Sequence, residues 1–235
     1  MVKACNLKIE TIRIITVGKV ASSAFKHSLN KKYKVSHGHS LLQLKDTIEN
    51  ETNTLIISGI RNPLARNVSY FFQTYSDEKN AMVLCKGNKY KGDKCYVMKR
   101  EAILDTTTDE IIKLFFKQKW HYIFVDWFEE FFRLTQIDTV AFPKELGYLL
   151  FPLDNNNWVL FYTFEKFSDN ITFFESFFDI SELKHTNNAD DRIYKDQYTA
   201  VKSAIKFPKS YKQKLLDTSA IKHFYSIDDI KQFYT

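Results

Sequence analysis

The sequence predicts an α/β fold: a single domain with a central, mostly parallel sheet flanked by helices. The main observation is that a strand, a loop and a helix follow one another twice within the first 75 residues. The chain has 235 residues, of which 44% are hydrophobic and 16% aromatic, so it can bury a sizeable core. Its 6 glycines and 4 prolines are too few for a Gly-rich linker or a turn-dense β-sandwich, so we expect one domain over residues 1–235.

The first strand–loop–helix unit begins with a β-branched run. Residues 11–17, TIRIITV, alternate partly and predict a strand. Ser22 or Ser23 can cap the following helix, which its apolar spacing extends to Tyr33. Residues 35–44, VSHGHSLLQL, are ambiguous and fit a strand end that leads into a turn of helix.

The second unit repeats this order. Residues 53–60, NTLIISGI, are rich in Leu and Ile, which is typical of a strand buried on both faces. Pro63 stands where the first turn of a helix tolerates proline, and residues 64–75 continue with helical spacing. Two such units in succession favour a parallel sheet.

Beyond residue 75, capping residues and apolar spacing predict helices, and apolar runs around a DNNN turn predict two strands. The polar, Lys-rich composition of segment 76–100 predicts that it lies on the surface. The predicted helices are 106–116, 120–134, 171–178 and two in the Lys-rich tail, the last opening at Ser226 with Asp229 three residues on. The predicted strands are 147–153 and 158–165.

Composition argues against some classes of protein. No stretch approaches the roughly 20 uninterrupted apolar residues of a membrane helix. Residues 1–17 fit a first core strand better than a signal peptide, so we expect a cytoplasmic location. Cys5, Cys85 and Cys95 are odd in number, lack metal-like spacing and fit a reducing compartment.

The loop after the first strand has the composition of an anion site. Small residues let an anion approach the backbone, the following helix offers free N–H groups and a positive dipole end, and Lys19 adds a charge. It is not a Walker loop, because Arg13 stands where that pattern requires glycine. An ordinary strand-to-helix turn is the alternative. The candidate residues are Gly18, Lys19, Val20, Ala21, Ser22, Ser23 and Ala24.

A second basic position follows the second strand. Arg61 leaves the carboxyl end of that strand, where ligands bind in open α/β sheets. Its planar guanidinium suits a terminal phosphate, and Ser69 on the next helix can face the same anion. A surface ion pair is the alternative for a single arginine, but two such units in one chain favour an anion site.

Together these stretches resemble the sulfotransferases that use 3′-phosphoadenosine 5′-phosphosulfate (PAPS). The resemblance rests on the Lys19 loop and on the pattern R-x-P-x-x-R-x-x-S, whose fixed positions are Arg61, Pro63, Arg66 and Ser69. It implies a P-loop-like sulfotransferase fold in which the Lys19 loop holds the 5′-phosphosulfate. It also implies that Arg61 and Ser69 hold the 3′-phosphate, with 3′-phosphoadenosine 5′-phosphate (PAP) as product and no metal required.

The segment HGHS at 37–40 resembles the part of the 2-O-sulfotransferase branch that carries the catalytic base. His37 and His39 are two apart, so they point the same way in an extended segment. A metal site would need further ligands, and no acidic or Cys cluster lies nearby in the sequence. By the resemblance, one histidine deprotonates a sugar hydroxyl, and His39 is favoured over His37.

Two later segments resemble bacterial proteins of capsular polysaccharide synthesis: residues 127–148, WFEEFFRLTQIDTVAFPKELGY, and residues 222–230, KHFYSIDDI. The Arg-Lys-Gly segment of the animal cytosolic enzymes has no counterpart here, which leaves the adenine pocket unassigned. Lys222 and His223 are the candidates for the remaining part of the nucleotide site. Four aromatic residues fit core packing better than substrate contact: Trp127, Phe128, Phe131 and Phe132.

The resemblance predicts transfer of a sulfuryl group from PAPS to a hydroxyl of a carbohydrate or glycan acceptor. The net charge of +6, the Lys-rich segment 195–222 and the many aromatic residues also suit a non-catalytic nucleic-acid-binding domain. A P-loop-like nucleotide kinase would need a Walker sequence and an Asp for magnesium, which do not occur together. A degenerate sulfotransferase fold that binds ligands without turnover is a further alternative.

Overall fold

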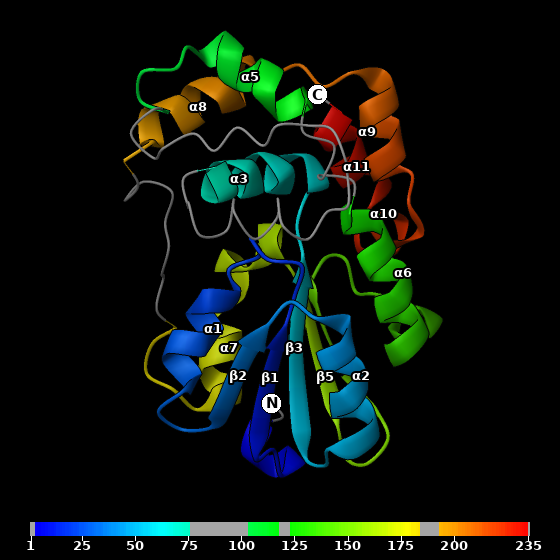
Figure 1. Cartoon of the computed structure of the whole chain (residues 1–235). Coiled ribbons are helices and arrows are strands. Elements are labelled where there is room, and N and C mark those ends of the chain that lie inside the picture. The colour runs from blue at the N-terminus through cyan, green and yellow to red at the C-terminus, as the bar shows by residue number, and fades with distance from the viewer. Residues whose placement is uncertain (1–2, 76–102, 118–122, 184–192, 235) are drawn as a thin grey trace. The chain divides into compact units, whose positions relative to one another are not determined.

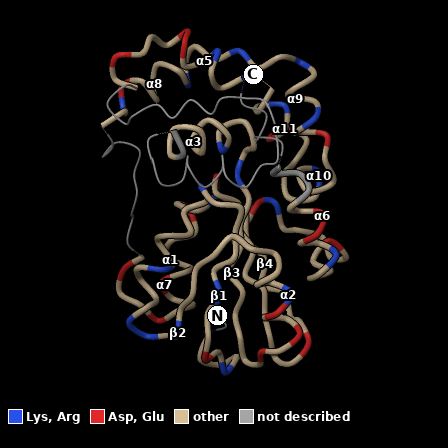
Figure 2. The backbone as a smooth tube through the Cα atoms, in the orientation of Figure 1, with Lys and Arg blue, Asp and Glu red and all other residues tan. Residues whose placement is uncertain are grey.

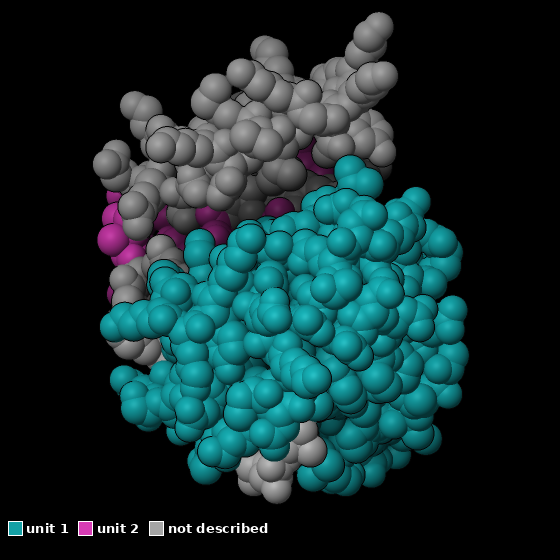
Figure 3. Space-filling view, turned by 90° about the horizontal axis from the view of Figure 1, so that it is seen from below, with its two compact units in different colours: residues 1–63, 122–187, 209–235 teal, residues 64–121, 188–208 magenta. Residues whose placement is uncertain are grey.

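The computed structural model describes residues 3–75, 103–117, 123–183 and 193–234. By their contacts these residues group into two compact units, coloured separately in Figure 3. The first unit comprises residues 1–63, 122–187 and 209–235, and the second comprises residues 64–121 and 188–208. The single sulfotransferase-like domain over residues 1–235 stays a prediction.

The first unit contains a five-stranded sheet in the order β2-β1-β3-β5-β4 (Figure 1). The pairings β1–β2, β1–β3 and β3–β5 are parallel, and β4 joins β5 antiparallel, so the expected mostly parallel α/β sheet is confirmed. The strands are β1 (Thr11–Ile15), β2 (Lys34–Gly38), β3 (Thr54–Ile60), β4 (Tyr148–Pro152) and β5 (Trp158–Thr163).

Helices cover both faces of this sheet, which explains why every residue of β3 is buried. Residues from α1 (Ser22–Leu29) and α7 (Ile171–Phe178) form one core cluster with the β1, β3 and β5 side chains that face them. On the opposite face Phe161 of β5 stacks on Phe224 of α10 (Ser219–Phe224), with ring centroids 4.1 Å apart, and contacts Phe131 of α6 (Ile123–Thr135). The two faces alternate along β5, because successive strand side chains point to opposite sides.

The helices of the first unit are α1 (Ser22–Leu29), α2 (Leu41–Asn50), α6 (Ile123–Thr135), α7 (Ile171–Phe178), α9 (Lys209–Leu216), α10 (Ser219–Phe224) and α11 (Ile227–Tyr234). Short 3₁₀ helices cover Ala4–Leu7, Ile137–Thr139, Phe164–Lys166 and Ser168–Asn170. None of the described helices has the length and hydropathy that crossing a bilayer requires.

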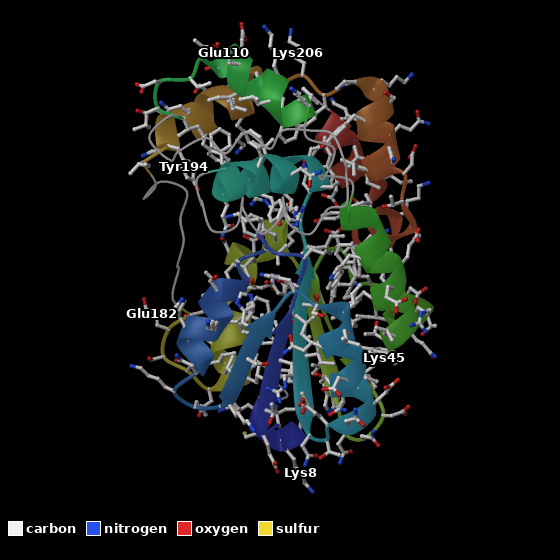
Figure 4. The ribbon with its side chains drawn as sticks, in the orientation of Figure 1. Lys8, Lys45, Glu110, Glu182, Tyr194 and Lys206 are labelled. Carbon is white, nitrogen blue, oxygen red and sulfur yellow. The ribbon has the colours of Figure 1, made fainter. Side chains whose placement is uncertain are left out.

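The second unit is built from aromatic contacts between helices. Its helices are α3 (Pro63–Tyr75), whose first residue closes the first unit, α5 (Thr108–Lys117) and α8 (Lys195–Ala204). Phe71 of α3 packs against Phe115 of α5, with ring centroids 5.5 Å apart. Phe72 contacts Tyr194, which is labelled in Figure 4, at 5.5 Å.

Local signals located most elements correctly, with one difference. The expectation that segment 35–44 is a strand end leading into a helix is confirmed, because it contains the end of β2 and the start of α2. The prediction of two helices in the Lys-rich tail was wrong, because the described tail contains α8, α9, α10 and α11. Pro208 separates α8 from α9, and Thr218 starts a new helix by accepting the N–H of Ile221 at 3.4 Å.

The predicted start of the last helix is confirmed by its capping hydrogen bonds. Ser226 N–H donates to Asp229 Oδ2 at 2.9 Å, and Asp229 N–H donates to Ser226 Oγ at 3.1 Å. The Lys-rich segment 76–100 lies outside the described residues.

Gly59 makes room for the largest side chain buried in the sheet. It lies opposite Tyr162 in the β3–β5 register, and a Cβ at this glycine would lie 2.8 Å from Tyr162 Cζ. The Tyr162 ring is only 1% exposed and has no space into which it can move. We therefore expect Gly59→Ala to lower the free energy of unfolding by about 1–3 kcal/mol, measured by urea denaturation.

Gly38→Ala is the matched control, because its Cβ would meet only the flexible end of the Gln43 side chain. This variant should lose much less stability. Equal unfolding midpoints for Gly59→Ala and the wild type would show that the sheet tolerates a side chain under Tyr162.

Candidate functional site

The candidate site lies at the carboxyl ends of β1 and β3. From β1 the chain moves to β2 on one side, and after α2 it returns to β3 on the other side, so the strand order reverses at β1. Ligands of open α/β sheets bind at such a reversal, outside the carboxyl ends of the strands. Residues 16–21 leave β1 there, and Arg61 leaves β3.

The structure brings these two segments into contact. Arg61 Nη1 donates to the carbonyl oxygen of Lys19 at 3.3 Å. The Arg61 guanidinium also stacks over the ring of Phe164, which follows β5, at 4.2 Å from its centroid. Among the described residues no carboxylate forms an ion pair with Arg61. Within the described residues, its positive charge is therefore not engaged in an ion pair at the end of β3.

The loop between β1 and α1 has an unusual backbone. Gly18, Lys19 and Ala21 have φ angles of 77°, 64° and 61°, in the left-handed region that residues with a Cβ rarely adopt. Such residues persist only where their surroundings hold them, and they cluster at ligand-binding turns. Gly18 N–H donates to Thr16 Oγ1 at 3.2 Å, which fixes the beginning of the turn.

Tyr162 holds the middle of this loop. Its hydroxyl donates to the carbonyl oxygen of Val20, and its ring packs beside Phe25 of α1 at 5.3 Å between centroids. Burial raises the pKa of Tyr162 far above its ordinary value, so the hydroxyl stays protonated as a donor. Our sequence analysis did not identify Tyr162, although Gly59 inside a buried strand is a signal for close packing there.

The N-terminus of α1 carries no side-chain cap. Ala21 is the N-cap residue, so Ser22 and Ser23 lie inside the first turn and the prediction that one of them caps the helix was wrong. The first turn also contains no acidic residue. Ala24 N–H donates to the Ala21 carbonyl oxygen at 3.0 Å, whereas the N–H groups of Ser22 and Ser23 precede every carbonyl acceptor of the helix, so this end presents donors and a positive dipole to an anion.

His39 is oriented by the same loop. Its Nδ1 lies 2.7 Å from the carbonyl oxygen of Thr16. A carbonyl oxygen only accepts, so Nδ1 carries the proton and Nε2 of the neutral ring presents a lone pair. The ring lies against Gly18, where a Cβ would be 3.6 Å from His39 Cε1. The side chain is exposed, so Nε2 can take a proton from a bound molecule.

His37 has a different environment. Its Nε2 lies 3.0 Å from Ser22 Oγ, and its ring centroid lies 5.1 Å from that of His39. Burial first, and then the charges of His39 and Lys26, lower the pKa of His37 to about 4. His37 is therefore neutral near pH 7 and is a weak proton acceptor.

The remaining predicted residues belong to other helices. Arg66 and Ser69 belong to α3 in the second unit, where the Arg66 guanidinium stacks over Tyr70 at 4.4 Å. The ammonium of Lys222 on α10 lies 3.9 Å from Asp217. His223 packs among aromatic rings, 4.7 Å from Phe224 and 5.5 Å from Phe132.

The aromatic residues of α6 are part of the core. Phe128 and Phe131 are fully buried, and Trp127 stacks on Phe131 with 17° between the ring planes. This burial agrees with the expected core packing. Within the described part of the chain, no group of three or more His, Cys, Asp or Glu is placed to hold a metal ion.

The low pKa of His37 predicts a loss of stability in acid. Because the folded-state pKa is about 4 and the ordinary value is 6.5, the unfolded chain binds more protons at pH values between them. The stability that neutral His37 contributes is therefore fully present above pH 6.5 and is lost as the pH falls towards about 4. After allowance for partial solvent exposure, we expect a loss of about 1–2 kcal/mol.

Urea denaturation of the wild type and of His37→Asn between about pH 7 and about pH 4.5 measures this effect, because asparagine does not titrate. As the pH falls, the free energy of unfolding of the wild type should decrease more than that of the variant. A difference that is independent of pH would contradict the assignment.

Comparison of the chain with protein-family models, with curated proteins and with solved structures gives no match. Its function is therefore inferred from the geometry of this site.

Proposed function

We propose that this chain is a sulfotransferase that moves a sulfuryl group from PAPS to a hydroxyl of a carbohydrate or glycan acceptor. The observation that carries the proposal is the contact between Arg61 and the Lys19 loop. An arginine without a carboxylate partner and an uncapped helix N-terminus lie at the same edge of one sheet. Such a pair suits a ligand with two separate anionic groups, as PAPS has.

In the proposed complex the 5′-phosphosulfate lies on the loop. The N–H groups of Ser22 and Ser23 donate to it, and the Lys19 ammonium neutralises its charge. The small side chains of Gly18, Ala21 and Ala24, with the backbone of Val20, allow close approach. Arg61 binds the 3′-phosphate and so sets the register of the donor, while the role that the resemblance gives to Ser69 stays a prediction. The expected P-loop-like sulfotransferase fold belongs to the same proposal.

The chemical step needs a base and an in-line geometry. His39 Nε2 takes the proton from the acceptor hydroxyl as its oxygen attacks sulfur, while the bond from sulfur to the bridging phosphate oxygen breaks. PAP leaves with that oxygen, and Lys19 offsets the negative charge that grows on it. The fixed Nδ1–H of His39 and the low pKa of His37 favour His39 as the base.

The charge distribution supports this proposal over non-catalytic nucleic-acid binding. Figure 2 shows Lys and Arg interspersed with Asp and Glu along the described chain. On the tail helices Lys222 pairs with Asp217 at 3.9 Å, and Lys231 pairs with Asp228 at 3.0 Å. Lysines that already pair with acids attract phosphate less than an open basic stripe does.

The first test is calorimetric titration of the chain with PAP, with ATP and AMP as comparison ligands. We expect micromolar binding of PAP, in preference to ATP. Arg61→Ala should weaken it by about tenfold or more, because a charge-assisted bond to phosphate is lost. Arg133→Ala is the control, since this exposed arginine already pairs with Glu130. Absence of PAP binding, or no preference over ATP, would contradict the donor site and favour the kinase and nucleic-acid alternatives.

The second test is turnover of radiolabelled PAPS with a panel of glycans, glycolipids and small alcohols. Lys19→Ala should lower kcat by about a hundredfold, and His39→Ala by about a hundredfold to ten-thousandfold, while both variants remain folded. The matched controls are Lys45→Ala and His27→Ala, which change exposed residues of α2 and α1. Wild-type turnover by a folded Lys19 or His39 variant would exclude the corresponding role.

A further inference from the structure

The segment KHFYSIDDI contains the nucleotide-site candidates Lys222 and His223, and a third side chain, that of Tyr225, is linked through Glu165 to the residue after Arg61. The Tyr225 hydroxyl donates to Glu165 Oε2 at 2.7 Å. The other oxygen of the same carboxylate, Oε1, accepts the N–H of Asn62 at 2.8 Å. One carboxylate therefore joins the C-terminal segment to the residue that follows Arg61.

Arg61 and Glu165 both act on the charge environment of Tyr225, but among the described residues they form no ion pair with each other. The Arg61 guanidinium stacks on Phe164, the residue before Glu165, and donates to the Lys19 carbonyl oxygen. A free carboxylate so near a guanidinium would be expected to pair with it through two parallel hydrogen bonds. Both oxygens of Glu165 are instead occupied by the neutral donors of Tyr225 and Asn62.

The Tyr225 hydroxyl remains protonated and so stays a hydrogen-bond donor. Burial, and then the negative charge and hydrogen bond of Glu165, raise the pKa of Tyr225 well above its ordinary value. The charge of Arg61 is close enough to oppose this rise. The hydroxyl therefore keeps its proton at neutral pH, and the bond to Glu165 is maintained.

We propose that Tyr225 and Asn62 hold Glu165 away from Arg61, and thereby keep the charge of Arg61 available to an anionic group of the donor. Tyr225 is then a positioning residue that acts through Glu165 and does not itself touch the ligand. The identity of the anion, the 3′-phosphate of the nucleotide, rests on the proposed function. The hydrogen-bond arrangement itself does not.

Tyr225→Phe tests this role, because it removes the hydroxyl and keeps the ring that packs against Phe233. Glu165 Oε2 then loses its donor and accepts from Arg61 instead, while Oε1 still accepts the Asn62 N–H, and this ion pair competes with the ligand. By calorimetry the full-length variant should bind PAP about tenfold more weakly than the wild type. The double variant Tyr225→Phe/Glu165→Gln removes the competing charge and should bind with about wild-type affinity.

This rescue distinguishes positioning from a purely structural role, because a fold weakened by a lost hydrogen bond is not repaired by the second change. Tyr33→Phe is the matched control, since it removes a bond from a tyrosine hydroxyl to the Phe178 carbonyl oxygen and should bind PAP normally. Unchanged binding by Tyr225→Phe, or weak binding that the double variant does not restore, would overturn the inference.

Two further measurements cover the remaining outcomes. If Tyr225→Phe does not fold, Glu165→Gln alone should bind PAP at least as tightly as the wild type, and a clear loss of affinity would overturn the inference. If the wild type does not bind PAP, the proposed function fails, and the same variants are titrated with inorganic pyrophosphate. The same loss and rescue would then support an anion site at Arg61, and no binding would overturn it.

Discussion

The hydrogen bond from Tyr162 to the carbonyl oxygen of Val20 is the interaction on which the candidate site depends. Two residues with a Cβ, Lys19 and Ala21, hold left-handed conformations in the same loop, and each costs free energy relative to an ordinary turn. A buried tyrosine that fits only because residue 59 is glycine supplies a fixed donor in the middle of that loop. The loop conformation is thus set by the sheet beneath it.

The charge at the site depends on which groups are missing as well as on which groups are present. The first turn of α1 lacks both a capping side chain and an acid, so nothing in the helix neutralises its dipole. Arg61 faces a carbonyl oxygen and an aromatic ring, while the nearby Glu165 bonds to neutral donors. Elsewhere charges follow the usual pattern, with exposed side chains such as Lys45 and Glu110 pointing outward (Figure 4).

Local sequence signals predicted much of the fold and part of the site. The runs at 11–17 and 53–60 predicted the two strands that carry the loop and Arg61, and the Ser226–Asp229 pair predicted the last helix start. The sequence did not predict left-handed φ angles at Lys19 and Ala21, because neither residue type favours them. It also did not predict the partners Tyr162 and Tyr225, since sheet pairing and packing bring them to the loop over long separations in the chain.

That separation has a consequence for how the site forms. Val20 and the tyrosine that holds it are 142 residues apart. The loop is synthesised long before its support, so it cannot keep its bound conformation until β5 has joined the sheet beside β3. Occupancy of the loop and closure of the sheet are therefore linked: a ligand that prefers the finished loop also stabilises the β3–β5 pairing. Under the proposed function, a bound nucleotide would therefore stabilise the β3–β5 pairing late in folding.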